Sequence, residues 1–123
     1  MKGLLEIWKI GLKRGILGAF ILLLLKKRAM HGFELAKEIE KVTQGTLKVK
    51  PKTLYPVLHR MMILNFVERV QEKSPIGPPR YIYRLTKNGE LLLKEVLLYY
   101  APIVKALIEL AKDELSELRE DER

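Results

Sequence analysis

The sequence predicts a mainly α-helical fold, with three helices, then a two-stranded β-hairpin, then one long helix. Apolar residues recur at helical spacing over residues 33–42 and 53–64, and residues 16–25 are apolar on every side. Residues 66–72 and 80–85 are instead rich in β-branched and aromatic residues, and three prolines and a glycine separate them. The pattern therefore places a helical unit first and an antiparallel hairpin directly after it.

The charge of the chain is unevenly distributed. Of its 123 residues, 48% are hydrophobic, which suffices for one core, so we expect one domain. The formal net charge is +8, but residues 1–108 carry +12 and residues 109–123 carry −4. A basic body with an acidic tail favours a polyanionic partner, through electrostatic steering and counterion release.

Cysteine is absent from the sequence, which removes disulfides and thiolate metal sites and agrees with a reducing cytoplasm. The apolar run of residues 15–25 is shorter than a bilayer-spanning helix, which needs about 20 residues. No small-residue cleavage site follows this run, so we expect neither a signal peptide nor a membrane partner. We therefore expect a cytoplasmic protein.

Residues 1–12 are interpreted as an N-terminal extension that contains a short helix. Gly11 and Gly15 each lower helix stability by about 1 kcal/mol relative to Ala, which predicts a break between residues 9 and 14. Residues 16–25 should then form a helix that is buried on most sides.

The second helix is predicted over residues 33–42, and His31 should serve the tight connection before it. Three cations, Lys26 to Arg28, end the first helix and have two readings: a solvated helix terminus or a phosphate contact. The inner face of the second helix is expected to consist of Phe33, Leu35, Ala36 and Ile39.

The third helix is predicted over residues 53–64, with Thr53 as its N-cap and Pro56 in its first turn. One face is apolar and the other is polar, and lysines precede the first turn. A DNA major groove admits one such helix and reads it mainly near its N-terminus. Considered alone, an ordinary surface helix with solvated lysines explains the stretch equally well.

The hairpin that follows has the position of a wing, so residues 13–86 are predicted to form a winged helix-turn-helix DNA-binding domain. Asn65 should take the left-handed conformation that ends the third helix. The residues expected to contact double-stranded DNA, in the third helix, its approach and the wing, are Lys48, Lys50, Lys52, Thr53, Tyr55, His59, Arg60, Lys73 and Arg80. For His59, solvation and a place near DNA are both open.

Residues 87–123 are interpreted as a long helix, capped by Thr86 and extending toward Ala111, followed by a frayed charged tail. Pro102 should kink or divide this helix. Its two adjacent apolar stripes exceed what a small core can cover, which predicts a homodimer. The dimerisation residues are expected to be Leu92, Leu93, Val96, Leu97, Tyr100, Ile103, Val104 and Leu107.

Three segments resemble signatures of the PadR family of transcriptional regulators. Residues 31–36 (HGFELA) are similar to its "HGYEL", and residues 45–47 with 51–60 (GTL, then PKTLYPVLHR) to its "PGTLYPALHRL". Residues 81–89 (YIYRLTKNG) are similar to its "YYRLTEKG", and the likeness covers roughly residues 14–95. The sequence departs from the family pattern at Lys50, Lys52 and Asn65, where the family usually has Ser, Gly and Gly.

The resemblance implies a homodimeric repressor that binds a palindromic operator. It also places the chain with the branch of the family that has a short C-terminal helix. It also implies a small aromatic effector near the dimer interface. Trp8, Tyr99 and Tyr100 have two readings, as the lining of such a pocket or as core packing.

Other function classes have less support. Only two histidines exist, with no ligand spacing between them, and no nucleophile–base pair is suggested, so neither an enzyme nor a cofactor or metal site is expected. A winged-helix module that binds only proteins stays open as the alternative.

Overall fold

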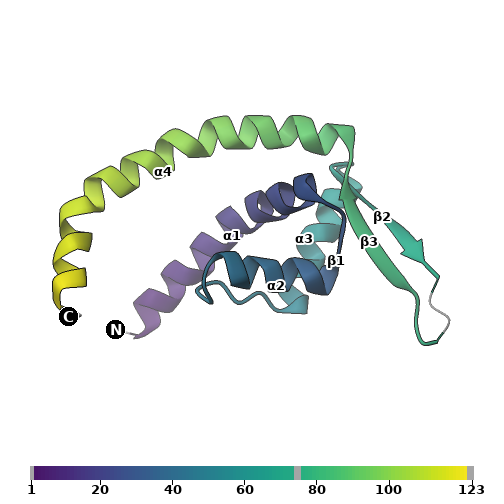
Figure 1. The fold of residues 1–123 in the computed structure, drawn as a ribbon, viewed down its shortest axis with the longest axis horizontal. Helices are drawn as coiled ribbons and strands as arrows, with labels where there is room; N and C mark the ends of the chain where they lie inside the picture. The colour runs from purple at the N-terminus through teal and green to yellow at the C-terminus, as the bar shows by residue number, and fades with distance from the viewer. Residues whose placement is uncertain (1, 74–75, 122–123) are drawn as a thin grey trace. The chain divides into compact units, whose positions relative to one another are not determined.

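The computed structural model describes residues 2–73 and 76–121 (Figure 1). The described chain divides into two compact units, Met1–Leu93 and Lys94–Arg123. Its elements are, in order, α1 (Lys2–Lys27), β1 (Met30–His31), α2 (Gly32–Val42), α3 (Pro51–Ile63), β2 (Val67–Glu72), β3 (Arg80–Leu85) and α4 (Lys87–Asp121). The mainly α-helical winged helix-turn-helix fold is thereby confirmed, with the long C-terminal helix in place.

Helix α1 is continuous from Lys2 to Lys27, so the predicted break between residues 9 and 14 is wrong. Its C-terminal half is anchored by buried residues such as Leu17 and Ile21. Once such a half is fixed, each further residue adds one hydrogen bond, and this gain outweighs the cost of about 1 kcal/mol for Gly11 or Gly15.

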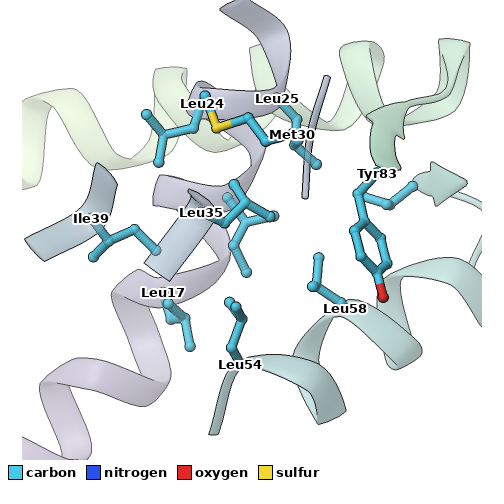
Figure 2. Packing of buried hydrophobic residues seen from close by; sticks show 11 residues of the cluster. Leu17, Leu24, Leu25, Met30, Leu35, Ile39, Leu54, Leu58 and Tyr83 are labelled. Atoms are coloured by element: carbon cyan, nitrogen blue, oxygen red, sulfur yellow. The ribbon is translucent and has the colours of Figure 1, made fainter. Parts of the chain in front are cut away.

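The core lies where α1, α2, α3 and the sheet meet (Figure 2). Leu35 and Ile39 of α2 and Leu58 of α3 have no exposed surface, and Tyr83 of β3 is 3% exposed. Phe33 was expected on the inner face of α2, but it is 52% exposed and stacks on the His31 ring at a centroid distance of 5.6 Å. Phe33 lies in the first turn of α2, beyond the edge of the core, which explains its exposure.

The N-cap of helix α3 lies three residues earlier than predicted, because Lys50 is the N-cap and Pro51 occupies the first helical position. Proline is favoured at that position, since its φ is already helical and no N–H bond is lost. Thr53 is therefore not the N-cap, and Pro56 lies inside the helix. Both corrections move the first turn of α3 toward the lysines that precede it.

The end of α3 follows the sequence prediction. Asn65 has a φ of 63°, in the left-handed region. The Phe66 N–H donates to the Met61 carbonyl at 2.8 Å, and the Asn65 N–H donates to the Met62 carbonyl at 3.0 Å. This pair of bonds is the Schellman motif, and it directs the chain from α3 straight into β2.

The sheet has three strands rather than the predicted two, in the order β1-β3-β2. The short strand β1 pairs antiparallel with β3, with Met30 opposite Tyr83 and His31 opposite Ile82. Two residues are too few to show any alternation, so sequence periodicity could not reveal this strand. The pairing ties the base of the wing to the start of α2.

Helix α4 starts as predicted: the Thr86 hydroxyl accepts the Gly89 N–H at 3.0 Å and donates to the Asn65 carbonyl at 2.6 Å. Helix α4 runs to Asp121, past the expected end at Ala111, and it is not divided at Pro102. The segment predicted as a frayed tail is thus helical as far as it is described. Its Glu, Leu, Lys and Arg residues are strong helix formers, which accounts for the extra length.

Candidate nucleic-acid interface

The outer face of α3 is set by the residues that the helix buries. Leu54 and Leu58 are 1% and 0% exposed, and they fix the rotation of α3 against α1 and α2. Because residues three or four apart share a helix face, the opposite face must point outward. The exposed side chains predicted to contact DNA from this helix are Lys52, Thr53, Tyr55, His59 and Arg60.

Lys48 and Lys50 lie on the approach to α3, and both are exposed. The Lys13 ammonium of α1 donates to the Lys48 carbonyl at 3.3 Å, so α1 touches this approach directly. The first turn of α3 offers few free N–H groups, because Pro51 has none and the Thr53 N–H donates to the Lys50 carbonyl at 2.9 Å. Attraction of phosphate here thus depends on side-chain charge and on the helix dipole more than on backbone donors.

Tyr55 leans from α3 over the N-terminus of α2. A Cβ built on Gly32 would clash with the Tyr55 hydroxyl and lie 2.8 Å from two carbons of its ring. Only glycine therefore leaves room for Tyr55 at this position. The ring is 43% exposed and lines a hollow of about 320 Å³ together with Phe33, Arg80 and Tyr81.

The wing presents a mixture of paired and exposed charges. Arg84 donates to Glu68 at 2.7 Å across the two strands, and the Arg69 guanidinium lies 4.1 Å from the centroid of the Tyr81 ring. The two cations predicted for DNA contact, Lys73 and Arg80, are exposed at the far end of the strands, where Arg80 lies opposite Glu72 in the register.

His31 connects the wing to α2 through both ring nitrogens. Nδ1 lies 2.7 Å from the Glu34 carboxylate and Nε2 lies 3.0 Å from the Glu72 carboxylate of β2. The His31 backbone N–H also donates to Glu34 at 3.0 Å, which completes a capping box at the start of α2. The predicted role of His31 in the turn before α2 is confirmed.

These contacts shift two ionisations. Hydrogen bonds from the backbone and then the ring of His31 lower the pKa of Glu34 to about 2. The hydrogen bond to Glu34, followed by the one to Glu72, raises the pKa of His31 above its ordinary value of 6.5. Sequence reasoning did not identify Glu72, because it lies 41 residues from His31 and no local pattern joins them.

Two of the three cations that end α1 have acidic partners. Lys26 lies 3.2 Å from Glu90, and Arg28 lies 3.1 Å from Glu34. These contacts favour the reading of a helix terminus over that of a phosphate contact.

A groove of about 680 Å³ runs between α1 and the outer face of α3. Leu17 and Val57 form part of its wall, and no acidic residue is among those that line it. Its cations are Lys13 and Arg14 from α1 and Lys52 and Arg60 from α3. Sequence reasoning missed Lys13 and Arg14, although their spacing from Leu17 on one helix face was a usable signal.

The residues predicted for dimerisation differ in exposure. Leu93 is only 5% exposed and belongs to the chain's own packed residues, so it has little surface left for a partner. Beyond it, Leu97, Ile103 and Val104 are 40%, 52% and 49% exposed, and Leu107 is 64% exposed. Leu92, Val96 and Tyr100 are half-buried.

Of the aromatic residues considered for an effector pocket, Trp8 and Tyr99 are exposed and Tyr100 is half-buried. Trp8 is 78% exposed and Tyr99 is 68% exposed, so packing within the core is not their role in this chain. The Tyr99 and Tyr100 rings lie 6.2 Å apart between centroids.

Within residues 2–73 and 76–121, no helix is both long and apolar enough to cross a bilayer. The same residues contain no cluster of three or more His, Asp or Glu side chains that could hold a metal ion.

Comparison with known proteins identifies the family. The chain matches the family described as "Transcriptional regulator PadR-like family" over residues 21–95. A protein of Lysinibacillus sphaericus, described only as uncharacterized protein X, is 32% identical over 97 residues, which are 79% of this chain and 88% of that protein.

Two solved structures have a similar fold. A PadR-like transcription factor from Bacteroides fragilis is 28% identical with a TM-score of 0.70, and the match covers 84% of this chain and 97% of that one. PadR of Bacillus subtilis, solved in complex with operator DNA, is 20% identical with a TM-score of 0.63, covering 87% and 66% respectively. Since the family match spans more than half of the sequence, the chain belongs to the PadR-like family of transcriptional regulators.

Proposed function

We propose that this chain is a sequence-specific double-stranded DNA-binding regulator that represses transcription as a homodimer on a palindromic operator. The observation that carries the proposal is the exposed cationic face of α3, which Leu54 and Leu58 fix against the core. Family membership makes the chain a transcriptional regulator rather than an enzyme. The related B. subtilis protein binds operator DNA, which supports the same kind of partner here.

The outer face of α3 has the chemistry to read bases. Lys52 and Arg60 can pair with guanine acceptors in the major groove, and each such pair discriminates by about 1–3 kcal/mol. Thr53 and His59 are exposed between them. We infer that these side chains carry sequence preference, whereas Lys48 and Lys50 contact phosphate.

Tyr55 is inferred to have a more specific role than the other side chains on the outer face of α3. Its ring lies against Gly32 at the N-terminus of α2, so the packing of α3 on α2 places it there before any DNA arrives. An aromatic ring in that position suits contact with a thymine methyl group or with the sugar edge.

The wing is inferred to position the protein rather than to read sequence. Arg80 lies at the last paired position of the strands and Lys73 lies just beyond it, and both are exposed cations whose contacts go to phosphate. Loss of either cation should weaken binding to all duplexes alike.

The homodimer is inferred from the apolar surface of α4. Leu97, Ile103, Val104 and Leu107 are each 40% exposed or more, and contiguous apolar surface of that kind usually marks an interface. Two symmetric copies of α3 would favour half-sites about one helical turn apart.

Exposed Trp8 and Tyr99 also support an aromatic effector, because an aromatic ligand could stack on either ring.

The proposal is tested by selecting bound fragments from random duplex DNA with the purified chain. The expected result is a palindromic consensus with two half-sites about 10 base pairs apart. Absence of enrichment, together with no salt-dependent duplex binding, would instead support a module that binds only proteins.

A further inference from the structure

The groove between α1 and α3 extends one continuous face of α1. Residues on that face recur every three or four positions, and its C-terminal part, Leu17, Ile21 and Leu25, is 4%, 0% and 4% exposed. One turn before Leu17 the same face changes to Lys13 and Arg14, which line the groove. The face is thus apolar where it meets the core, and beside α3 it carries the cations Lys13 and Arg14 next to Ile10.

The groove concentrates positive charge on one flank of α3. Lys13 and Arg14 of α1 line the same groove as Lys52, Pro56 and Arg60 of α3. The residues that line the groove include no acid, whereas Lys9, Lys26, Arg28 and Arg84 elsewhere in this unit each have a carboxylate partner. Four like charges repel one another, so the arrangement favours an anionic ligand.

We propose that one phosphodiester strand of the operator lies in this groove, and that Lys13 and Arg14 of α1 are phosphate contacts. The inference rests on the proposed DNA-binding function and adds α1 to the interface. A helix in the major groove is flanked by two backbones, because the groove is only about 12 Å wide. The wing serves one of them, and the groove between α1 and α3 serves the other.

Lys13 has a second task in this arrangement. Its ammonium donates to the Lys48 carbonyl at 3.3 Å, which holds the approach to α3 near α1. Arg14 is exposed, so its replacement is the cleaner probe of charge alone.

The test compares Lys13→Gln with Arg14→Gln, singly and together, in the full chain. Gln has nearly the helix propensity of Lys and Arg, so the fold should persist. Binding is measured on the selected operator and on scrambled duplex at several salt concentrations. The slope of log K against log salt is negative, and each lost contact should make it shallower by about 0.9 per protomer. The ratio of operator affinity to scrambled-duplex affinity should be unchanged.

Two controls test whether a change in slope comes from the charge in the groove. The first changes the net charge elsewhere, and the second changes the Lys13 side chain but keeps its charge. Lys41→Gln with Lys105→Gln removes the same charge from exposed positions outside the groove, and it should leave the slope unchanged. Lys13→Arg keeps the charge, and it should keep the unaltered slope.

The outcomes are distinguishable. An unchanged slope in the double groove variant overturns the inference, because Lys13 and Arg14 would then be solvated cations. A fall in the operator-to-scrambled ratio also overturns it, because the groove would then be reading sequence. If the unaltered chain binds no duplex at all, the proposed function itself fails, and this inference fails with it.

Discussion

Replacing Gly32 by alanine should disturb α3 through Tyr55. The added Cβ would lie 2.8 Å from the Cε1 and Cζ atoms of Tyr55, about 0.6 Å less than the 3.4 Å of ordinary contact. Forcing an extra methyl group into such a place costs about 1–3 kcal/mol. Since Tyr55 is 43% exposed, its ring can escape toward solvent, so we expect a loss in the lower half of that range.

The assay is a double-mutant cycle by urea denaturation at fixed protein concentration. Gly32→Ala should destabilise the chain by about 1–2 kcal/mol, and the loss should nearly vanish when Tyr55→Ala is also present. Gly11→Ala is the matched control, because a methyl group added at Gly11 meets nothing within 4 Å, and it should stabilise helix α1 by about 0.5–1 kcal/mol. A Gly32→Ala loss that persists in the Tyr55→Ala background would refute this reasoning.

Three further outcomes are expected. Leu97→Glu with Val104→Glu should give monomer or aggregate, and light scattering that shows a stable monomer for the unaltered chain at micromolar concentration would count against the dimer. Arg80→Ala should weaken binding to every duplex alike and lower the salt slope by roughly one, so a changed sequence preference would assign base reading to the wing. Because the pKa of Glu34 is about 2, the contribution of Glu34 to the free energy of unfolding is present above pH 4.5 and is lost toward pH 2. Because the pKa of His31 is raised, the contribution of His31 is present below pH 6.5 and is lost as the pH rises through the raised value. Urea midpoints should therefore show that His31→Ala costs most between about pH 4.5 and 6.5, and a pH-independent cost would contradict the network.

Elements with a strong local signal could be predicted from the sequence. The strand Arg80–Leu85 has the expected bounds, since its alternation and the prolines before it act within a few residues. The turn at Asn65 and the cap at Thr86 likewise depend on one side chain each. The cationic face of α3 followed from helical spacing, because the apolar positions leave only one face outward.

The features that sequence reasoning missed depend on contacts between distant segments. Strand β1 exists only because β3 lies beside Met30 and His31. The bond between His31 and Glu72 joins residues 41 positions apart. The exposure of Phe33 depends on where the core ends, and the groove at Lys13 depends on how α1 crosses α3. Local patterns contain little of this information: the spacing of Lys13 from Leu17 gives the face of α1 on which it lies, but not the element opposite that face.

The central claim is that α3 reads the operator, and alanine substitution of its outer face tests it most directly. Lys52, Thr53, His59 and Arg60 would each be replaced singly, with binding measured on the selected operator and on scrambled duplex at several salt concentrations. We expect at least one variant to lose roughly tenfold in the operator-to-scrambled ratio, which corresponds to about 1.4 kcal/mol, while its unfolding midpoint is unchanged. An equal loss on both duplexes in every variant would contradict the claim, because α3 would then only position the protein.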